Sequence, residues 1–157
     1  MSATTKTRRL LAVAIRPYTV ADLHRVIHIA DGPPGEGWGW PELKKAINRS
    51  GAEMLVAESD RGVVGFVVVQ PTPGCVEVVR LGVCPSARRK GVGSILLAAA
   101  CGEAARQGKG VGCVVPEHND PVIGLLARSG FRGELRRKFY RDGGDAIRFT
   151  LAVEMWK

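Results

Sequence analysis

No long apolar run occurs in this sequence of 157 residues. A membrane-spanning helix needs about 20 apolar residues, whereas the longest candidate, residues 95–101, is short and rich in alanine, which is typical of a buried helix. The N-terminal residues are polar and basic and lack the apolar stretch and cleavage site of a signal peptide. We therefore expect a flexible basic tail over residues 1–9, a single domain over residues 10–157, no membrane partner and a cytoplasmic location.

Closely spaced cysteines are also absent. The four cysteines, at positions 75, 84, 101 and 113, form no Cys-x-x-Cys pair of the kind that binds zinc. We therefore expect no metal site. We expect the four thiols to stay reduced in the cytosol and to pack as small apolar side chains.

Acidic residues are scarce, because 15 Asp and Glu stand against 23 Lys and Arg, which gives a net charge of +8. A basic chain raises the question of nucleic acid binding. The basic residues, however, are spread over several segments, and aromatic residues, 6% of the chain, are rarely interleaved with them. We predict no nucleic acid partner and attribute part of the excess positive charge to an anionic cofactor.

Apolar periodicity alternates between the patterns of strands and helices along the chain. Strands are expected at residues 10–16, 53–59, 63–70, 75–83, 110–115, 131–138 and 146–154. Helices are expected at residues 20–30, 41–48, 91–107 and 121–129. The predicted order is β-α-α-β-β-β-α-β-α-β-β, an α/β (α+β) domain with a meander of three strands over residues 53–83.

A glycine-rich turn, Arg-Arg-Lys-Gly-Val-Gly-Ser over residues 88–94, lies between an expected strand and an expected helix. The first backbone N–H groups of a helix have no partner within it and lie at the positive end of its dipole, so this turn predicts an anion site. Gly91 and Gly93 have no Cβ and would let phosphates approach the backbone closely. The turn is not a P-loop, because no Gly-x-x-x-x-Gly-Lys-Ser/Thr is present, and the third glycine of a dinucleotide fingerprint would fall at Leu96.

Two sequence blocks resemble the GNAT acetyltransferase superfamily. The first is Arg88-x-x-Gly91-x-Gly93, preceded by Leu-Gly-Val-Cys-Pro at 81–85, which is similar to the acetyl-CoA motif of that superfamily. The second runs from Asn119 to Ser-Gly-Phe at 129–131, where the family has an Asn, a helix and a Gly-Phe that enters the next strand. The resemblance covers roughly residues 10–157. It implies the GNAT fold, with a mixed, mostly antiparallel sheet that splays beside the cofactor helix and carries helices on both faces.

The resemblance also implies which residues hold acetyl-CoA. The amides of residues 89–94 would bind the pyrophosphate, and the preceding strand end would face the thioester. Asn119 would lie near the pantetheine arm, and it can also cap the helix that follows. The implied cofactor-binding residues are Leu81, Gly82, Val83, Arg88, Arg89, Lys90, Gly91, Val92, Gly93, Ser94 and Asn119.

Glu77 is the candidate general base. Histone acetyltransferases of the GNAT superfamily carry their catalytic Glu at this position, counted back from the motif, here six residues before Val83. Strand alternation predicts that Glu77, Val79 and Leu81 share one face, and burial among valines would raise the pKa of the carboxyl group and suit it to proton transfer near neutral pH. The alternative is an ordinary exposed strand Glu. By the resemblance, the N–H of Leu81 or its neighbour would stabilise the oxyanion.

The residue at the position of the family's general acid departs from the family pattern. Many members carry a Tyr on the helix after the Asn, four residues before the Gly of Gly-Phe, and here that position is Leu126. The chain has two tyrosines, Tyr18 and Tyr140, so either Tyr140 protonates the leaving thiolate or water does. A protein that binds acetyl-CoA without much turnover also stays open.

The segment Lys-Phe-Tyr-Arg-Asp-Gly-Gly-Asp-Ala over residues 138–146 resembles the late hairpin of N-terminal acetyltransferases, including the ribosomal-protein alanine type. In that subgroup this hairpin and an early loop clamp a peptide N-terminus, and Trp-Pro-Glu at 40–42 is similar to that loop. The candidate substrate-binding residues are therefore Trp38, Trp40 and Tyr140. The subgroup's Glu falls at Val114, so Glu117 or His118 would have to replace it.

These features predict an acetyl-CoA-dependent N-acetyltransferase that moves the acetyl group to a primary amine by direct attack in a ternary complex. A protein N-terminus or a lysine is the first acceptor hypothesis. A small amine, such as a polyamine, an amino acid or an antibiotic, is the second, although a polyamine would favour an acidic cleft. A non-catalytic acetyl-CoA sensor is the third. Members of the family often dimerise through their last strands, so a homodimer stays open.

Overall fold

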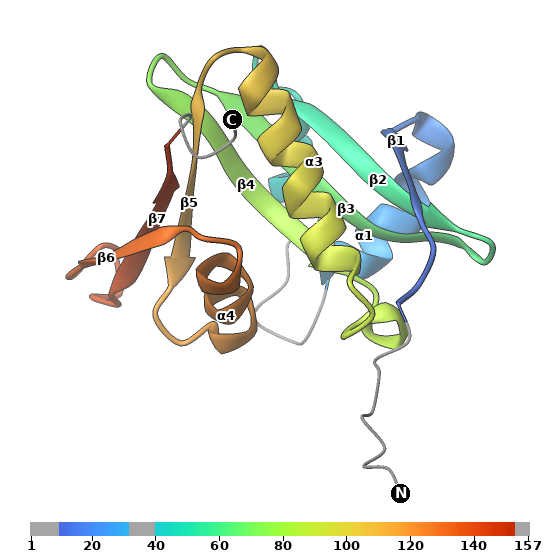
Figure 1. Ribbon diagram of the computed structural model, residues 1–157. Coiled ribbons are helices and arrows are strands. Elements are labelled where there is room, and N and C mark those ends of the chain that lie inside the picture. The colour runs from blue at the N-terminus through green and yellow to red at the C-terminus, as the bar shows by residue number, and fades with distance from the viewer. Residues whose placement is uncertain (1–9, 32–39, 153–157) are drawn as a thin grey trace, which may run out of the picture.

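A seven-stranded sheet organises the computed structural model, which describes residues 10–31 and 40–152 (Figure 1). The strands are β1 (Ala14–Pro17), β2 (Glu53–Ser59), β3 (Gly62–Pro71), β4 (Cys75–Val83), β5 (Gly110–Pro116), β6 (Arg132–Arg136) and β7 (Ala146–Leu151). The helices are α1 (Leu23–Asp31), α2 (Trp40–Ile47), α3 (Val92–Arg106) and α4 (Asp120–Arg128), with short 3₁₀ helices η1 (Val20–Asp22) and η2 (Pro85–Ala87). None of these helices is long and apolar enough to cross a membrane. The predicted order of strands and helices is confirmed, and the tail expected over residues 1–9 lies outside the described residues.

The strands lie in the order β1-β2-β3-β4-β5-β7-β6. Neighbouring strands are antiparallel except β4 and β5, which are parallel. A parallel pair needs a crossover connection, and α3 makes this crossover on one face of the sheet, while α1 packs on the other face (Figure 1). The predicted sheet, mixed and mostly antiparallel with helices on both faces, is therefore confirmed.

Three strands are shorter than predicted. β1 begins at Ala14 rather than at residue 10, because the backbone N–H of Leu11 bonds to the carbonyl of Lys90 (3.0 Å) instead of to a strand. β6 ends at Arg136 rather than at residue 138, where Lys138 turns the chain with a φ of 50°. β7 ends at Leu151, because Ala152, which follows, is no longer part of the strand. The first change brings the segment before β1 against the glycine-rich turn.

Helix α1 begins later than predicted. The helix was expected over residues 20–30, but Val20 lies in η1 and is 81% exposed. The helix instead buries Val26, Ile29 and Ala30, which follow one another at helical spacing. The α-helix begins at Leu23, directly after η1, so the residues from Leu23 onward determine which side chains face the sheet.

Two glycines let the helices approach the sheet closely. A Cβ on Gly65 would lie 2.9 Å from Leu96 of α3, and a Cβ on Gly82 would lie 2.6 Å from the ring of Phe66 and 3.3 Å from Ile29 of α1. Such contacts are too short for a carbon atom in a close-packed core. Gly82 was expected to bind the cofactor, but its missing side chain serves the packing of α1 on the sheet.

We predict that Gly82→Ala lowers the free energy of unfolding by about 1–3 kcal/mol, because the added methyl group must displace Phe66 and Ile29. Gly74→Ala, in the turn before β4 where a Cβ meets nothing within 4 Å, is the control and should change stability by about 0.5 kcal/mol or less. Urea denaturation of the two variants measures the difference. Equal stability of both would show that the core around Phe66 relaxes.

Candidate active site

The strands β4 and β5 diverge after a short paired stretch. Their parallel pairing covers only three residue pairs, from Cys75–Gly110 to Glu77–Gly112. Beyond these pairs the strands separate, so that residues 78–83 of β4 have no strand partner on the β5 side. Backbone groups at such an edge can bind a ligand in place of a strand. The splayed sheet that the resemblance implied is therefore present.

A cavity of about 80 Å³ lies where the two strands separate. Its walls come from β4, β5, α3 and α4 and are mainly aliphatic. The lining residues are Val78, Val79, Arg80, Leu81, Leu97, Cys113, Val114, Val115, Pro116, Asn119, Val122, Leu125 and Leu126. These described lining residues include no carboxylate, so the cavity suits an apolar or amide-containing arm of a ligand better than a cation.

The glycine-rich turn presents backbone N–H groups at the start of α3. Gly91 precedes the helix with a left-handed φ of 85°, and Arg89 also has a positive φ, 62°. The first helical hydrogen bond runs from Ile95 N–H to the Gly91 carbonyl (3.1 Å), which leaves the amides of residues 92–94 without a helical acceptor. Such free amides, together with the helix dipole, are suited to an anion; that they bind the cofactor's pyrophosphate stays a prediction.

A β-bulge changes which residues share a face of β4. Val68 pairs with Arg80, but the next residue of β3, Val69, pairs with Val78, so Val79 is an extra residue in β4. Directly paired residues lie on the same face of a sheet. Glu77 therefore shares a face with Arg80 and Gly82, and Leu81 lies on the opposite face. The predicted common face of Glu77, Val79 and Leu81 is wrong, because strand alternation cannot anticipate a bulge.

Glu77 forms a bidentate ion pair with Arg148 of β7. Arg148 Nη1 lies 2.7 Å from Glu77 Oε2, and Arg148 Nη2 lies 2.5 Å from Glu77 Oε1. Each side chain is 24% exposed, so the pair is partly accessible. A planar guanidinium and a carboxylate bind each other especially well in this paired arrangement. The sequence analysis did not identify Arg148, because no local pattern indicates a partner 71 residues away.

The ion pair reverses the predicted pKa shift of Glu77. Burial raises the pKa of this carboxyl group, but the hydrogen bonds and charge of Arg148, together with a hydrogen bond from the Cys75 thiol (3.2 Å), outweigh burial and lower the pKa below its ordinary value. The same contact raises the pKa of Arg148. The expectation of a raised pKa is therefore wrong, and in this state Glu77 is a weak base.

A glycine in β5 makes room for the pair. Gly112 lies opposite Glu77 in the parallel register, and a Cβ at this position would collide with the guanidinium of Arg148 and lie 2.8 Å from Glu77 Oε1. Three neighbouring strands thus contribute to one small polar site at the point where the sheet splays. This site lies on the face that α1 covers, whereas α3 and α4 line the cavity from the other face.

Comparison with known proteins identifies the family. Residues 23–131 match the model of the acetyltransferase (GNAT) family. The chain belongs to this GNAT family. No curated protein gives a significant match to the sequence.

Solved structures of other acetyltransferases superpose on most of this GNAT domain. The ribosomal-protein-S18-alanine N-acetyltransferase from Escherichia coli is 22% identical, with a TM-score of 0.78 over 90% of this chain and 94% of the other. Arabidopsis thaliana NAA60 in complex with acetyl-CoA is 20% identical, with a TM-score of 0.74 over 90% and 99%. A nourseothricin acetyltransferase is 22% identical, with a TM-score of 0.72 over 90% and 99%. These similarities confirm the fold, and the names of the three proteins point to different acceptors.

GNAT acetyltransferases use acetyl-CoA, and the described residues fit it. The amides of residues 92–94 can bind a pyrophosphate, and the aliphatic cavity at the gap between β4 and β5 can hold an apolar or amide-containing arm. Gly93 also has a packing role, because a Cβ there would face Leu125 of α4 at 3.3 Å. Its missing side chain therefore lets α4 pack closely against the start of α3.

The other predicted cofactor residues differ in how far their side chains are exposed. Arg88, Arg89 and Ser94 are exposed, so their side chains can meet a charged ligand at the surface. Val92 is 1% exposed, so its side chain belongs to the core and only its amide can bind. Leu81 and Asn119 line the cavity. Lys90 and Val83 are partly buried beside the turn, and whether they contact the cofactor stays a prediction.

The position of the usual acidic Tyr is apolar here. Leu126 is 1% exposed and lines the cavity, so it has no proton to donate. Tyr140 lies in the turn between β6 and β7, where its ring meets that of Phe139 edge to face at 5.1 Å, and it is not among the residues lining the cavity. Burial, followed by the charges of Cys113 and Asp142, raises the pKa of Tyr140 and keeps it protonated. A role for Tyr140 as general acid stays a prediction.

The early substrate loop can be described only in part. Trp38 lies outside the described residues, and Trp40 begins α2, although its side chain is also outside them. Val114, at the position of the subgroup's Glu, lines the cavity and pairs with Arg148 of β7. Glu117 and His118 are exposed at the end of β5. Of Val114, Glu117 and His118, which the structure describes, Val114 is the one that lines the cavity, and it cannot take a proton.

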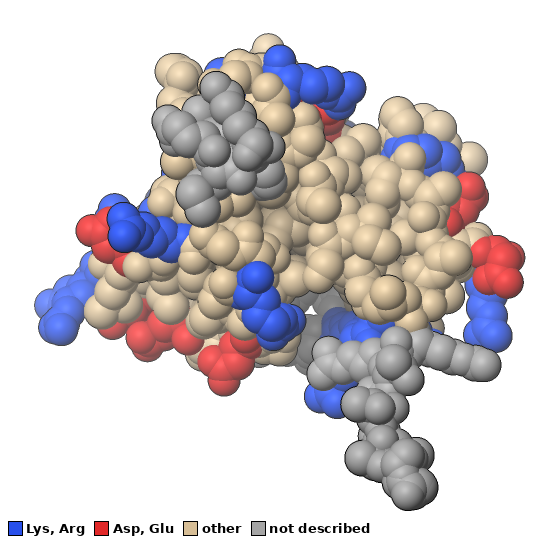
Figure 2. All heavy atoms as spheres, viewed as in Figure 1, with Lys and Arg blue, Asp and Glu red and all other residues tan. Residues whose placement is uncertain are grey.

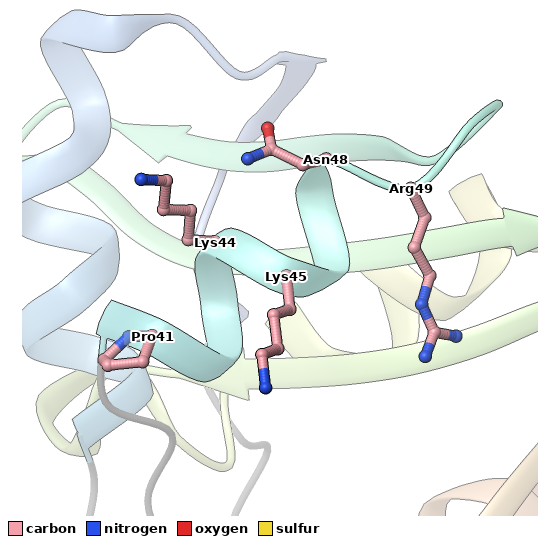
Figure 3. A pocket seen from close by; sticks show the side chains of 5 residues that line it. All are labelled: Pro41, Lys44, Lys45, Asn48 and Arg49. Carbon is pink, nitrogen blue, oxygen red and sulfur yellow. The ribbon is translucent and has the colours of Figure 1, made fainter.

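A second concavity lies on the outer face of α2 and is shallow, with a volume of about 490 Å³ (Figure 3). Its side chains are Pro41, Lys44, Lys45, Asn48 and Arg49, all from α2 and the turn after it. None of the predicted site residues whose side chains the structure describes is among them. The basic side chains cluster near the C-terminal end of the helix, where cations interact favourably with the helix dipole, so the basic cluster has a structural explanation.

Charged side chains form no continuous basic patch on the face shown in Figure 2. Lys and Arg occur there as separate groups interspersed with Asp and Glu, and the centre of this face is mostly uncharged. A nucleic acid backbone is bound by a continuous basic stripe. The absence of a nucleic acid partner stays a prediction that agrees with this distribution.

We predict that Gly91→Ala weakens acetyl-CoA binding by about 5- to 10-fold, because Ala is strained by about 1–2 kcal/mol at a φ of 85° and relaxation would misdirect the amides of residues 92–94. Gly108→Ala imposes similar strain at the other end of α3, where φ is 66° and a Cβ meets nothing within 4 Å. Isothermal titration with acetyl-CoA measures both affinities. Similar losses in both variants would attribute the effect to general destabilisation instead.

Proposed function

We propose that this protein transfers the acetyl group of acetyl-CoA to a primary amine of a protein, either an N-terminal amine or a lysine, by direct attack in a ternary complex. The amine nitrogen bonds to the acetyl carbon, the carbon–sulfur bond of the thioester breaks, and the proton lost by the amine ends on the coenzyme A sulfur. The observation that carries the proposal is the position of Glu77 at the point where the sheet splays, in the last residue pair that joins β4 and β5.

The proposed roles divide the site between two faces. Residues 92–94 and the aliphatic cavity hold acetyl-CoA on the side of α3 and α4, and its thioester supplies the acetyl group. Glu77, on the side of α1, binds the amine and takes its proton. The backbone N–H of Leu81 or its neighbour, on the unpaired edge of β4, donates to the thioester oxygen. Tyr140 or water returns a proton to sulfur.

Two features bear on the acceptor and on the location of the reaction. The segment over residues 138–146 and the segment Trp-Pro-Glu at 40–42 resemble the peptide clamp of N-terminal acetyltransferases, which favours a protein amine. The reaction would take place in the cytoplasm, where the four free thiols stay reduced. A homodimer through the last strands stays a prediction.

A catalytically weak acetyl-CoA sensor is the second candidate function. It is favoured by Leu126, which leaves the cavity without the usual proton donor, and by the weak basicity of Glu77 in its ion pair. A small-molecule acetyltransferase is the third candidate. Its polyamine form is disfavoured by the net charge of +8, which repels a polycation.

The test compares Glu77→Gln with wild type. Turnover should fall by about 10²- to 10⁴-fold, the usual contribution of a general base, while the affinity for acetyl-CoA changes little. Thiol release from acetyl-CoA, measured with peptides of different N-terminal residues, lysine peptides and small amines, reports turnover, and titration reports binding.

Glu134→Gln is the matched control, because Glu134 forms an exposed ion pair with Arg136 on β6. This variant should keep wild-type turnover. Equal turnover of Glu77→Gln and wild type would exclude Glu77 as the base. Tight acetyl-CoA binding by wild type without turnover of any acceptor would contradict the proposed enzyme activity and support the sensor function.

A further inference from the structure

The ion pair of Glu77 and Arg148 blocks the very group that is to receive the amine. Both carboxylate oxygens of Glu77 are engaged by the guanidinium, at 2.7 and 2.5 Å, and Cys75 also donates to Oε1 at 3.2 Å. An incoming ammonium group would have to displace Arg148 from Glu77. The kind of acceptor therefore depends on which group can serve as a counter-ion for Arg148 after this displacement.

A simple amine is a poor replacement for Arg148. It would satisfy Glu77 but leave the guanidinium, 24% exposed, without a counter-ion, and a partly buried unpaired charge is costly. The surroundings add to this cost. Arg80, partly buried on the same face of β4, is a second cation, and Lys109 lies beyond Cys75, where its Nζ bonds to the carbonyl of Thr72 (2.7 Å).

An acceptor that carries its own carboxylate removes this cost. Its carboxylate can take the place of Glu77 on Arg148 in the same paired geometry, and its amine can take the place of Arg148 on Glu77. The exchange keeps every charge paired. It also removes the guanidinium from Glu77, which then becomes a stronger base because burial remains.

On the basis of the acetyl transfer proposed above, we infer that the acceptor carries a carboxylate within a few bonds of its amine and that Arg148 binds this carboxylate while the amine meets Glu77. This chemistry occurs in a protein whose first residue is Asp or Glu, and in a free amino acid. Gly112 provides the space in which both groups are exchanged, since a Cβ there would fill it. Lysine side chains and polyamines lack the carboxylate and would be poor acceptors.

The test uses acceptor pairs that differ only in the carboxylate. Peptides that begin with Asp are compared with peptides that begin with Asn, Glu with Gln, and free amino acids with their amides. Wild-type kcat/KM, measured by thiol release, should be at least about 10-fold higher for the carboxylate member, as expected for one charge-assisted hydrogen-bonded pair. A carboxylate preference seen with the peptides alone identifies a protein N-terminus as the acceptor. A carboxylate preference seen with the amino acids alone identifies a small molecule as the acceptor.

Variants of Arg148 assign the preference to this residue. Arg148→Gln should reduce the ratio within each pair to about 2-fold or less and raise the pKa seen in the kcat/KM profile, whereas Arg148→Lys should keep part of the preference. Arg106→Gln, which removes an exposed ion-paired arginine at the end of α3, is the control and should keep the full preference. Binding of acetyl-CoA checks that each variant is folded.

The outcomes separate this inference from the proposed function. Turnover with equal kcat/KM for both members of each wild-type pair, or a preference for lysine peptides or polyamines, would overturn the inference and leave acetyl transfer intact. A carboxylate preference that persists in a folded Arg148→Gln variant would also overturn it. Binding of acetyl-CoA without turnover of any acceptor would overturn both.

Discussion

The divergence of β4 and β5 is the constraint on which the rest of the site depends. Only three residue pairs join these strands, and a sheet that continued to pair would leave neither a cavity nor an unpaired strand edge. The divergence is stable because α3 and α4 fill the space with aliphatic side chains, including Leu97, Leu125 and Leu126. The apolar residue at position 126 thus serves packing, and proton transfer has to be arranged elsewhere.

The bulge at Val79 determines which side chains of β4 share a face near the site. An extra residue in β4 reverses the alternation beyond it, so that Glu77 and Arg80 point to one face and Leu81 to the other. Side chains of both faces, Arg80 on one and Leu81 on the other, therefore line the cavity at the splay. Gly82, on the face of Glu77, then allows α1 to close the core beneath that side.

Much of this architecture could be predicted from the sequence. The order of strands and helices follows from periodicity and turn residues, and the anion site follows from Gly91 at a helix start, because both are local properties. Arg148 could not be found in this way, since its partner Glu77 lies 71 residues away and only the sheet order brings them together. The packing roles of Gly82 and Gly93 were missed for the same reason, because a glycine in the sequence does not reveal which side chain lies opposite.

The charge of the site connects these observations. A net charge of +8 attracts an anionic cofactor over long distances, and the same field favours an anionic acceptor over a polyamine. Near the splay, Arg148 holds Glu77 as a carboxylate with a lowered pKa. Under the proposed roles, Glu77 would therefore be a weak base as long as the ion pair is intact. An acceptor that exchanges partners with the pair would release this base only when the amine itself is in place, which would couple recognition of the acceptor to the chemical step.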